Sequence, residues 1–288
     1  MTEMTQQARA QAPRRLSSLV ELLAEHPNAT LVAGGTDLMV AVNAGAEPDG
    51  VLVDLTRVEE LHDVEVTHDR VRIGAGVPLA RVERELQHVA PGLVQACRTV
   101  GSPQIRARAT LGGNIVTASP AGDCLPVLVA TDAWVELASL DGVRRVPARH
   151  LFESPGRIAR RPGECVLAVS LPRAEVGAQH FLKVGVRNAM VIAVVSAAVH
   201  LDIAGGRLGL GFGSVGPRPM SAAAAEIHAA TRLHATGTLD EADLAVIAQL
   251  VRGEIRPIDD HRGTASYRRA VAGTLAVRGV RRALEGMS

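Results

Sequence analysis

The spacing of apolar residues divides this 288-residue chain into a first part of short alternating elements and a last part of long strands followed by helices. Apolar positions three or four residues apart predict helices in the first part. These helices cover residues 16–26, 38–44, 78–87 and 92–100. Runs of β-branched or alternating residues predict strands. These strands cover residues 30–33, 51–55, 64–67, 71–74, 134–140, 144–146 and 165–171.

Cap and turn signals separate these elements. Ser17 or Ser18 is expected to cap the first helix. Residues 68–69 and 141–142 are expected to form hairpin turns, the second of them with the Asp-Gly pair that such turns favour. Residues 104–109 lead into a glycine-rich stretch, which we expect to be a loop.

The pattern changes near residues 172–177, which we take as a domain boundary. Long strands follow at residues 180–186, 192–203 and 207–215, the last two joined at a Gly-Gly turn. Helices are then predicted at residues 221–232, 239–251 and 266–284. Strands followed by helices predict an α+β unit.

Composition limits the classes of function. The formal net charge is +1 and no long run of like charge occurs, so a nucleic-acid-binding surface is not expected. The chain has only three Phe, one Trp and one Tyr. A planar ligand would therefore rest largely on aliphatic side chains and backbone.

Cysteines and apolar runs bear on location. Cys97, Cys124 and Cys165 match no metal or iron–sulfur spacing, and we expect them to be buried free thiols in a reducing cytoplasm. The most apolar run, residues 190–199, is too short to span a bilayer. Residues 1–15 resemble a loose tail rather than a signal peptide.

Two glycine-rich stretches carry the candidate chemistry. They read VAGGTDLM at residues 32–39 and TLGGNIVTASPAGD at residues 110–123. Glycine lets backbone N–H groups approach a ligand closely, and successive N–H groups before a helix bind anions. Asp37 would repel a phosphate, so we expect it to face ribose hydroxyls or its own backbone. Each stretch alone is also typical of a tight turn.

Four sequence blocks together resemble the FAD-binding medium subunit of the molybdenum hydroxylases, the group that includes xanthine and carbon monoxide dehydrogenases. The blocks are VAGGTDLM, QIRARATLGGNIVTASPAGDCLPVLVA, FLKVGVRNAMVIAV and DDHRGTASYRR. They occur in the order and at the spacing usual for that family, and the resemblance covers nearly the whole chain. The long second block is the most specific.

The resemblance implies an α+β fold with two domains. The first would be a PCMH-type FAD-binding domain over residues 1–174, built as two subdomains of about residues 1–58 and 59–174. The second would be a C-terminal domain of antiparallel strands with helices, over residues 175–288, like that of the carbon monoxide dehydrogenase flavoprotein.

The resemblance also implies which residues contact FAD. They are Val32, Ala33, Gly34, Gly35, Thr36, Asp37, Leu38, Val100, Thr110, Leu111, Gly112, Gly113, Asn114, Asp123, Val166 and Lys183. Residues 32–38 would wrap the pyrophosphate, and residues 110–114 would form a second phosphate and ribose loop. Asp123 would hold a polar part of the cofactor. Lys183 would lie near the flavin ring, as would the two valines at 100 and 166.

Several of these polar residues have other interpretations. Asp123 could cap a helix beginning near Leu125, and Lys183 could be a solvated strand residue. Arg106 and Arg108 could belong to a charged face or contact a partner. The run at residues 259–262 is expected to be loop and cap rather than a metal or acid–base cluster, and residues 267–269 to be structural or interfacial. For residues 119–120 two alternatives stay open, a contact with FAD and a simple turn of the chain.

The function that the resemblance implies is electron transfer. The chain would take electrons through FAD from [2Fe–2S] clusters of a small partner subunit, which draws them from a molybdenum cofactor in a large partner subunit. The acceptor would be NAD, a quinone, oxygen or another molecule, and the assembly a dimer of heterotrimers that binds neither nucleic acid nor membrane.

Two other functions remain open from the sequence. One is a stand-alone FAD-dependent oxidoreductase that acts on a small molecule, which would need a catalytic base over the flavin. The other is a flavin-free binding or scaffold module with the same fold. No catalytic residue and no metal ligand is identified, because no nucleophile–base pair or metal-binding His spacing occurs.

Overall fold

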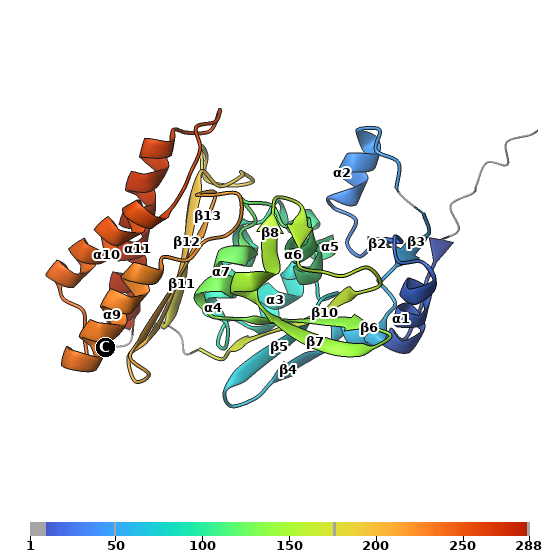
Figure 1. The fold of residues 1–288 in the computed structure, drawn as a ribbon, viewed down its shortest axis with the longest axis horizontal. Helices are drawn as coiled ribbons and strands as arrows, with labels where there is room; N and C mark the ends of the chain where they lie inside the picture. The colour runs from blue at the N-terminus through green and yellow to red at the C-terminus, as the bar shows by residue number, and fades with distance from the viewer. Residues whose placement is uncertain (1–9, 49, 175–176, 287–288) are drawn as a thin grey trace, which may run out of the picture.

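The computed structural model describes residues 10–48, 50–174 and 177–286. Three groups of elements follow one another along the long axis of the molecule, from the N-terminal strands and helices to the C-terminal helices (Figure 1). Residues 1–9 of the expected tail, and residues 175–176 of the expected boundary, lie outside the described residues.

The N-terminal group is a three-stranded parallel sheet in the order β1-β3-β2. Its elements are β1 (Ala10–Gln11), α1 (Leu16–Glu25), β2 (Thr30–Val32), α2 (Leu38–Asn43) and β3 (Leu52–Asp54). The predictions of helices at α1 and α2 and of strands at β2 and β3 are confirmed. The tail prediction was wrong for residues 10–11, which pair with β3. The cap prediction was also wrong, because α1 begins after Arg15 without a side-chain cap.

The central group is a five-stranded antiparallel sheet in the order β4-β5-β10-β6-β7. Its strands are β4 (Val64–Val66), β5 (Arg70–Gly74), β6 (Trp134–Ser139), β7 (Gly142–Pro147) and β10 (Cys165–Pro172). Both expected hairpins are present. The position of β10 between them was not predicted, since strand neighbours distant in sequence leave no local signal.

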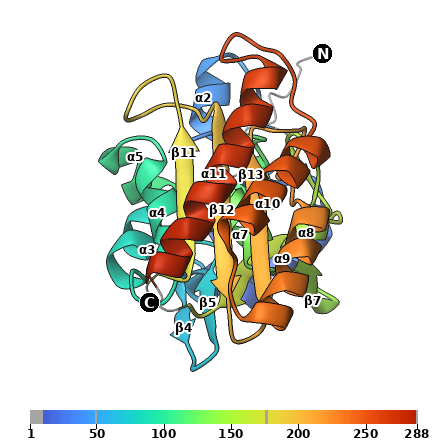
Figure 2. The ribbon, with the colours of Figure 1, turned by 90° about the vertical axis from the view of Figure 1, so that its left-hand side faces the viewer.

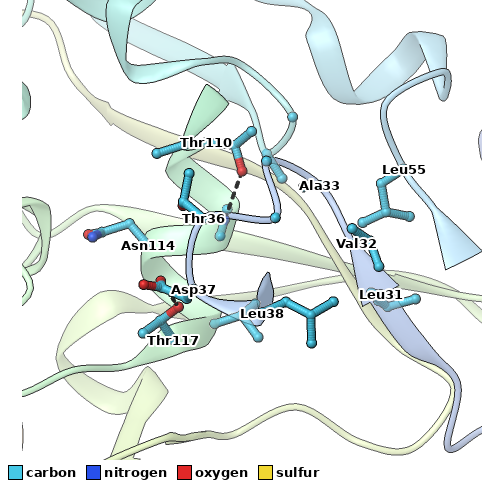
Figure 3. Close-up of a pocket in the computed structure, with 18 of the residues that line it drawn as sticks. Leu31, Val32, Ala33, Thr36, Asp37, Leu38, Leu55, Thr110, Asn114 and Thr117 are labelled. Atoms are coloured by element: carbon cyan, nitrogen blue, oxygen red, sulfur yellow. Dashed lines mark hydrogen bonds between the residues drawn. The ribbon is translucent and has the colours of Figure 1, made fainter. Parts of the chain in front are cut away.

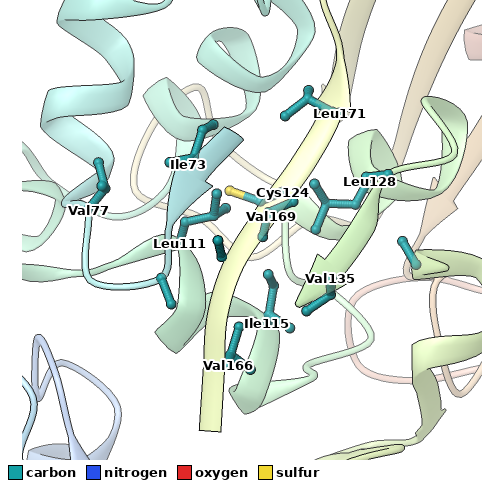
Figure 4. Close-up of a cluster of buried hydrophobic side chains, with 14 of the residues drawn as sticks. Ile73, Val77, Leu111, Ile115, Cys124, Leu128, Val135, Val166, Val169 and Leu171 are labelled. Atoms are coloured by element: carbon teal, nitrogen blue, oxygen red, sulfur yellow. The ribbon is translucent and has the colours of Figure 1, made fainter. Parts of the chain in front are cut away.

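Helices and short strands surround this sheet. They are η1 (Glu59–His62), α3 (Leu79–Glu85), α4 (Pro91–Thr99), α5 (Pro103–Arg108), α6 (Leu111–Thr117), α7 (Cys124–Ala130), α8 (Ala148–Leu151), β8 (Phe152–Ser154) and β9 (Arg157–Ile158). Figure 4 shows the buried core where Leu111 and Ile115 of α6 meet Val169 of β10. The prediction of a loop at residues 110–114 was wrong, because Thr110 caps α6 and the glycines lie in its first turn.

The C-terminal group is an antiparallel sheet in the order β11-β12-β13, followed by three helices. Its elements are β11 (Gln179–Val184), β12 (Val195–Asp202), β13 (Arg207–Gly213), α9 (Ala223–Thr236), α10 (Glu241–Glu254) and α11 (Ala265–Gly286). The helices cover one face of the sheet (Figures 1 and 2). The α+β class and the strands-then-helices order expected from the sequence are confirmed.

The other face of this sheet packs on helices of the central group. Strand β13 lies directly on the backbone of α7: a Cβ on Gly209 would be 1.9 Å from the Ala130 carbonyl oxygen, and one on Gly211 equally close to that of Pro126. Real side chains cannot approach so closely, so glycine is required at both positions. The contact fixes α7 relative to the strands β11 to β13.

No helix in the described residues combines the length and the apolar character needed to cross a bilayer.

A buried arginine connects α11 to the C-terminal sheet. Arg268 is 3% exposed, and its Nη1 donates hydrogen bonds to the carbonyl oxygens of Val194 (2.9 Å) and Ser214 (2.8 Å). Its Nη2 donates to Asp260 at 2.5 Å. These bonds give the sequence block at residues 267–269 a structural role at Arg268.

Arg268→Ala should lower the free energy of unfolding by about 3 kcal/mol, because it leaves two carbonyl oxygens and a carboxylate without their cationic donor. Urea unfolding of the full chain measures the change. Arg269→Ala is the control, since Arg269 is less buried. Equal stabilities for the two variants would contradict the structural role.

Candidate cofactor site

A cavity of about 660 Å³ lies between the N-terminal and central groups of elements. Its walls are formed by residues 29–38, by single residues between 55 and 79, and by parts of residues 100–117 that include the start of α6. Residue 160 and residues 165–166 of β10 complete them. Figure 3 shows side chains from these walls around the turn after β2. The volume lies in the range of small-molecule and cofactor sites, about 300–1,000 Å³.

The turn from β2 into α2 (residues 34–38, here the amide loop) is shaped by its two glycines. Gly35 has φ +72°, a left-handed conformation that glycine adopts without strain. At Gly34 a Cβ would lie 2.1 Å from the carbonyl oxygen of Arg108. The amide loop therefore rests directly on the backbone where α5 gives way to α6.

Five successive N–H groups of the amide loop are available to a ligand. In the described chain the main-chain N–H groups of Gly34, Gly35, Thr36, Asp37 and Leu38 have no hydrogen-bond acceptor. All five residues line the cavity. Consecutive free N–H groups in such a turn form a concavity that binds anions. This part of the site therefore fits a phosphate-bearing cofactor.

The start of α6 presents a different chemistry. The N–H groups of Leu111 and Gly112 donate to the carbonyl oxygens of Val77 (3.2 Å) and Ala75 (2.8 Å), and that of Gly113 donates to Thr110 Oγ1 (3.0 Å). The N–H of Asn114 donates to the Thr110 carbonyl oxygen at 3.0 Å, so in the described structure none of the N–H groups of residues 111–114 is free for a second phosphate.

The polar atoms left at this wall belong to side chains. Asn114 Oδ1 is buried without a partner in the described structure, and the Thr110 hydroxyl retains a proton to donate. A ligand hydroxyl or amide could pair with either group. The start of α6 can therefore hold a ligand through side chains rather than through its backbone.

Asp37 is turned away from the amide loop's N–H groups by a bond to α6. Its Oδ2 accepts a hydrogen bond of 2.7 Å from Thr117 Oγ1 (Figure 3). In the described structure this carboxylate links the two glycine-rich stretches instead of bonding to its own backbone, and its contact with a ribose stays a prediction. The bond ties the amide loop to the last turn of α6.

Asp123 and Lys183 form a buried ion pair behind the main cavity. Lys183 Nζ lies 2.5 Å from Asp123 Oδ2, and their side chains are 9% and 6% exposed. Thr99 donates to the same carboxylate oxygen at 2.9 Å and accepts from Lys183 through its carbonyl oxygen at 3.3 Å. Burial raises the pKa of the Asp123 carboxyl, although Lys183 and Thr99 act in the opposite direction.

This pair corrects two of the alternatives from the sequence. Asp123 stands at the N-cap position of α7, but its side chain makes no capping bond. Lys183 is buried rather than solvated. It lines a second cavity of about 580 Å³, which shares Gly101 with the first. The pair therefore borders the second cavity through Lys183, whereas neither residue lines the main cavity.

Most of the residues expected from the sequence are brought together at the main cavity. They are Val32, Ala33, Gly34, Gly35, Thr36, Asp37, Leu38, Val100, Thr110, Gly112, Gly113, Asn114 and Val166. Leu111 is instead fully buried in the core, and Asp123 and Lys183 lie behind the wall. The sequence interpretation missed Thr117, which lies in the second glycine-rich stretch, and Arg160 and Cys165, which lie in no motif; all three also line the cavity.

Other polar candidates have internal partners. Arg106 pairs with Glu83 at 2.5 Å and also donates to the carbonyl oxygens of Val100 and Gly101, so it stabilises the turn beside the cavity. Residues 119–120 turn the chain, and the Pro120 carbonyl oxygen accepts from Ser214 N at 2.8 Å.

The acidic run at residues 259–262 is loop and cap, as expected. Asp260 accepts bonds from the main-chain N–H groups of Arg262 (2.8 Å) and Gly263 (3.2 Å), and Asp259 accepts from Ala265 N. No cluster of His, Cys, Asp or Glu suited to a metal occurs in the described residues.

Comparisons with known families match both parts of the chain. Residues 6–174 match the family described as the FAD-binding domain in molybdopterin dehydrogenase. Residues 180–283 match the family described as the carbon monoxide dehydrogenase flavoprotein C-terminal domain.

Individual relatives agree with these families. The chain is 29% identical over 262 residues to the xanthine dehydrogenase FAD-binding subunit of Escherichia coli O157:H7, covering 88% of each chain. It is 30% identical to the glyceraldehyde dehydrogenase medium chain of Sulfolobus acidocaldarius, covering 91% of this chain and 93% of that one.

Solved structures give the same result. A chain of reconstituted carbon monoxide dehydrogenase from Oligotropha carboxidovorans superposes with a TM-score of 0.88 at 27% identity, covering 96% of this chain and 98% of that one. A chain of quinoline 2-oxidoreductase from Pseudomonas putida 86 has a TM-score of 0.86 at 26% identity, covering 97% and 98%.

Gly34→Ala should lower FAD affinity roughly tenfold or more, because the amide loop must move off the Arg108 carbonyl and lose charge-assisted hydrogen bonds. Flavin fluorescence titration of the full chain measures the affinity. Gly253→Ala is the control, since a Cβ there meets nothing within 4 Å. Unchanged FAD affinity in Gly34→Ala would show that the loop's position is immaterial.

Lys183→Met should destabilise the fold by about 3 kcal/mol at neutral pH, because it leaves the Asp123 carboxylate buried and unpaired. The native pKa of Asp123 then rises further above its unfolded value. The loss of unfolding free energy in Lys183→Met should therefore become smaller as the pH falls and the Asp123 carboxyl protonates.

Urea unfolding at neutral and mildly acidic pH measures this change. The double variant Lys183→Met with Asp123→Asn should recover most of the loss, since no charge is then left unpaired. A loss in Lys183→Met that is the same at both pH values would count against the ion pair as its cause.

Proposed function

From the premise that this chain belongs to the family of FAD-binding subunits of the molybdenum hydroxylases, we propose that it carries electrons through FAD from partner-held [2Fe–2S] clusters to a separate acceptor. The observation that supports this most directly is the run of five free N–H groups on one wall of a cavity. That run suits the diphosphate of a dinucleotide cofactor.

In this proposal different residues around the cavity bind different parts of the cofactor. The amide loop holds the diphosphate with main-chain N–H groups and the Thr36 hydroxyl. Thr110 and Asn114 pair with ribose or ribityl hydroxyls through their side chains. Val100 and Val166 give the flavin an aliphatic surface. Bound FAD supplies the redox chemistry, and the chain supplies orientation and charge.

Lys183 and Asp123 set the charge beside the flavin in this proposal. Their ion pair is anchored by Thr99, which lines the second cavity and directly precedes Val100 of the main cavity wall. A lysine there stabilises negative charge that develops on the ring, while Asp123 holds the lysine in place. Both residues act on the cofactor's electronics rather than on a substrate.

The groups that line the cavity do not favour direct oxidation of a small molecule. Asp37 is bound to Thr117, and burial raises the pKa of the Cys165 thiol to about 12. A general base works best with a pKa near the working pH, which this thiol does not have. The stand-alone oxidoreductase is therefore the weaker alternative.

The partners follow from what the reaction needs. A [2Fe–2S] cluster takes four protein ligands, usually cysteines, and this chain has three cysteines, all buried. We propose a small iron–sulfur subunit and a large molybdenum subunit, assembled with this chain as a dimer of heterotrimers in the cytoplasm. We also propose the domain limits 1–174 and 175–288, which the two hydrophobic cores support because they fall mostly on either side of that boundary. Within the first domain we propose subdomains of about residues 1–58 and 59–174.

The full chain purified alone should show flavin absorption, because the cavity fits FAD without help from a partner. Iron–sulfur absorption should be added only when the small and large subunits are co-expressed and co-purified. Visible spectra measure both.

Gly113→Val is the matched variant for this experiment. A Cβ there meets only Thr110 Oγ1, at 3.0 Å, so the larger side chain would extend into the cavity and reduce flavin content. A wild-type chain that cannot be loaded with FAD would overturn the proposal.

A further inference from the structure

The cavity contains a cation that the proposed function does not use. Among the described residues that line it, Arg160 is the one basic residue and Asp37 the one acidic residue. Arg160 lies in the connection between β9 and β10, outside both glycine-rich stretches. It therefore adds a positive charge to a site whose other polar groups are the Asp37 carboxylate, the Cys165 thiol, backbone amides, hydroxyls and one amide side chain.

The charge of Arg160 has no carboxylate partner within the described structure. Its Nη1 donates to the main-chain oxygen of Glu164 at 2.6 Å, which holds the guanidinium in place. The Glu164 carboxylate itself is occupied by Arg144, at 2.5 and 2.8 Å, and by the main-chain N–H of Arg161 at 2.7 Å. Four of the five guanidinium donors of Arg160 thus remain available for a ligand.

Contacts at the end of α6 place Arg160 on the same side as the amide loop. Strand β9, directly before Arg160, packs against α6. Gly156 N donates to the carbonyl oxygen of Ala118, the residue that ends α6, at 3.3 Å. Thr117, one residue earlier, holds Asp37 of the amide loop. The connection that carries Arg160 and the amide loop therefore meet at one end of this helix.

Charge balance indicates the group that Arg160 recognises. A dinucleotide diphosphate carries about two negative charges, and Asp37 adds a third at the same wall. Backbone amides offer only partial charges, whereas a guanidinium pairs with phosphate oxygens through two parallel hydrogen bonds. We propose that Arg160 binds the diphosphate of FAD together with the amide loop. This inference rests on the proposed assignment of that loop to the diphosphate.

Replacing Arg160 tests the proposal in the full chain. Arg160→Ala should raise the dissociation constant for FAD roughly ten- to hundredfold, the value of a charge-assisted hydrogen bond. Arg160→Lys keeps the charge but loses the paired N–H donors of the guanidinium, so its FAD affinity should lie between those of the wild type and Arg160→Ala. Flavin fluorescence titration gives these constants, and thermal unfolding of the FAD-free variants checks that the fold is intact.

Arg161→Ala is the matched control. Arg161 is the next residue, is exposed, and does not line the cavity. Its bond to Glu164 uses the main-chain N–H, which the variant retains. Its FAD affinity should equal that of the wild type, and a loss as large as that of Arg160→Ala would overturn the proposal.

Competition by ADP identifies the part of FAD that is recognised. ADP has the diphosphate without the flavin, so its inhibition constant should rise in Arg160→Ala by the same factor as the FAD constant. An unchanged ADP constant, or a wild type from which ADP displaces no FAD, would overturn recognition of the diphosphate. Unchanged FAD affinity in Arg160→Ala would also overturn it. Absence of FAD binding by the wild type would instead refute the proposed function.

Discussion

The contact between β13 and α7 is the constraint on which the rest of the structure depends. Gly209 and Gly211 let the strand lie on the carbonyl groups of Ala130 and Pro126, closer than any side chain would permit. All seven residues of α7 are buried, between the C-terminal sheet and the central core. Ion pairs reinforce the same junction: Asp132, just after α7, binds Arg207 of β13 at 2.5 Å. The central group of elements and the C-terminal sheet are thereby held in a fixed relative position.

That fixed distance makes the Asp123–Lys183 pair possible. Asp123 immediately precedes α7, and Lys183 lies on β11 of the opposite half. Burying two charges is costly unless they meet in good geometry, and the β13–α7 contact supplies that geometry without depending on the pair. Thr99 then links the pair to the wall of the main cavity. Packing of the two halves thus determines the electrostatics beside the proposed flavin position.

The two glycine-rich stretches, which look alike in sequence, do opposite things. In the amide loop the glycines free the backbone: Gly35 turns it, Gly34 lets it rest on Arg108, and five N–H groups stay open. In α6 the glycine allows close packing instead: Gly112 lies against Ala75, and its N–H donates to the Ala75 carbonyl oxygen and is not available to a ligand. One stretch therefore suits an anion, and the other offers side chains.

The sequence by itself determined the local elements and the site's chemical type. Apolar periodicity predicted α1, both hairpins and the strands-then-helices order, because those signals lie within a few residues of one another. The resemblance also named thirteen residues that line the cavity, eleven of them within the motif blocks. The tertiary structure alone decided that β10 lies between two hairpins, that Thr110 starts a helix and that Asp123 meets Lys183. It also decided that Arg160 borders the cavity. The strand order, the ion pair and the place of Arg160 depend on contacts between residues far apart in the chain, which no local pattern records.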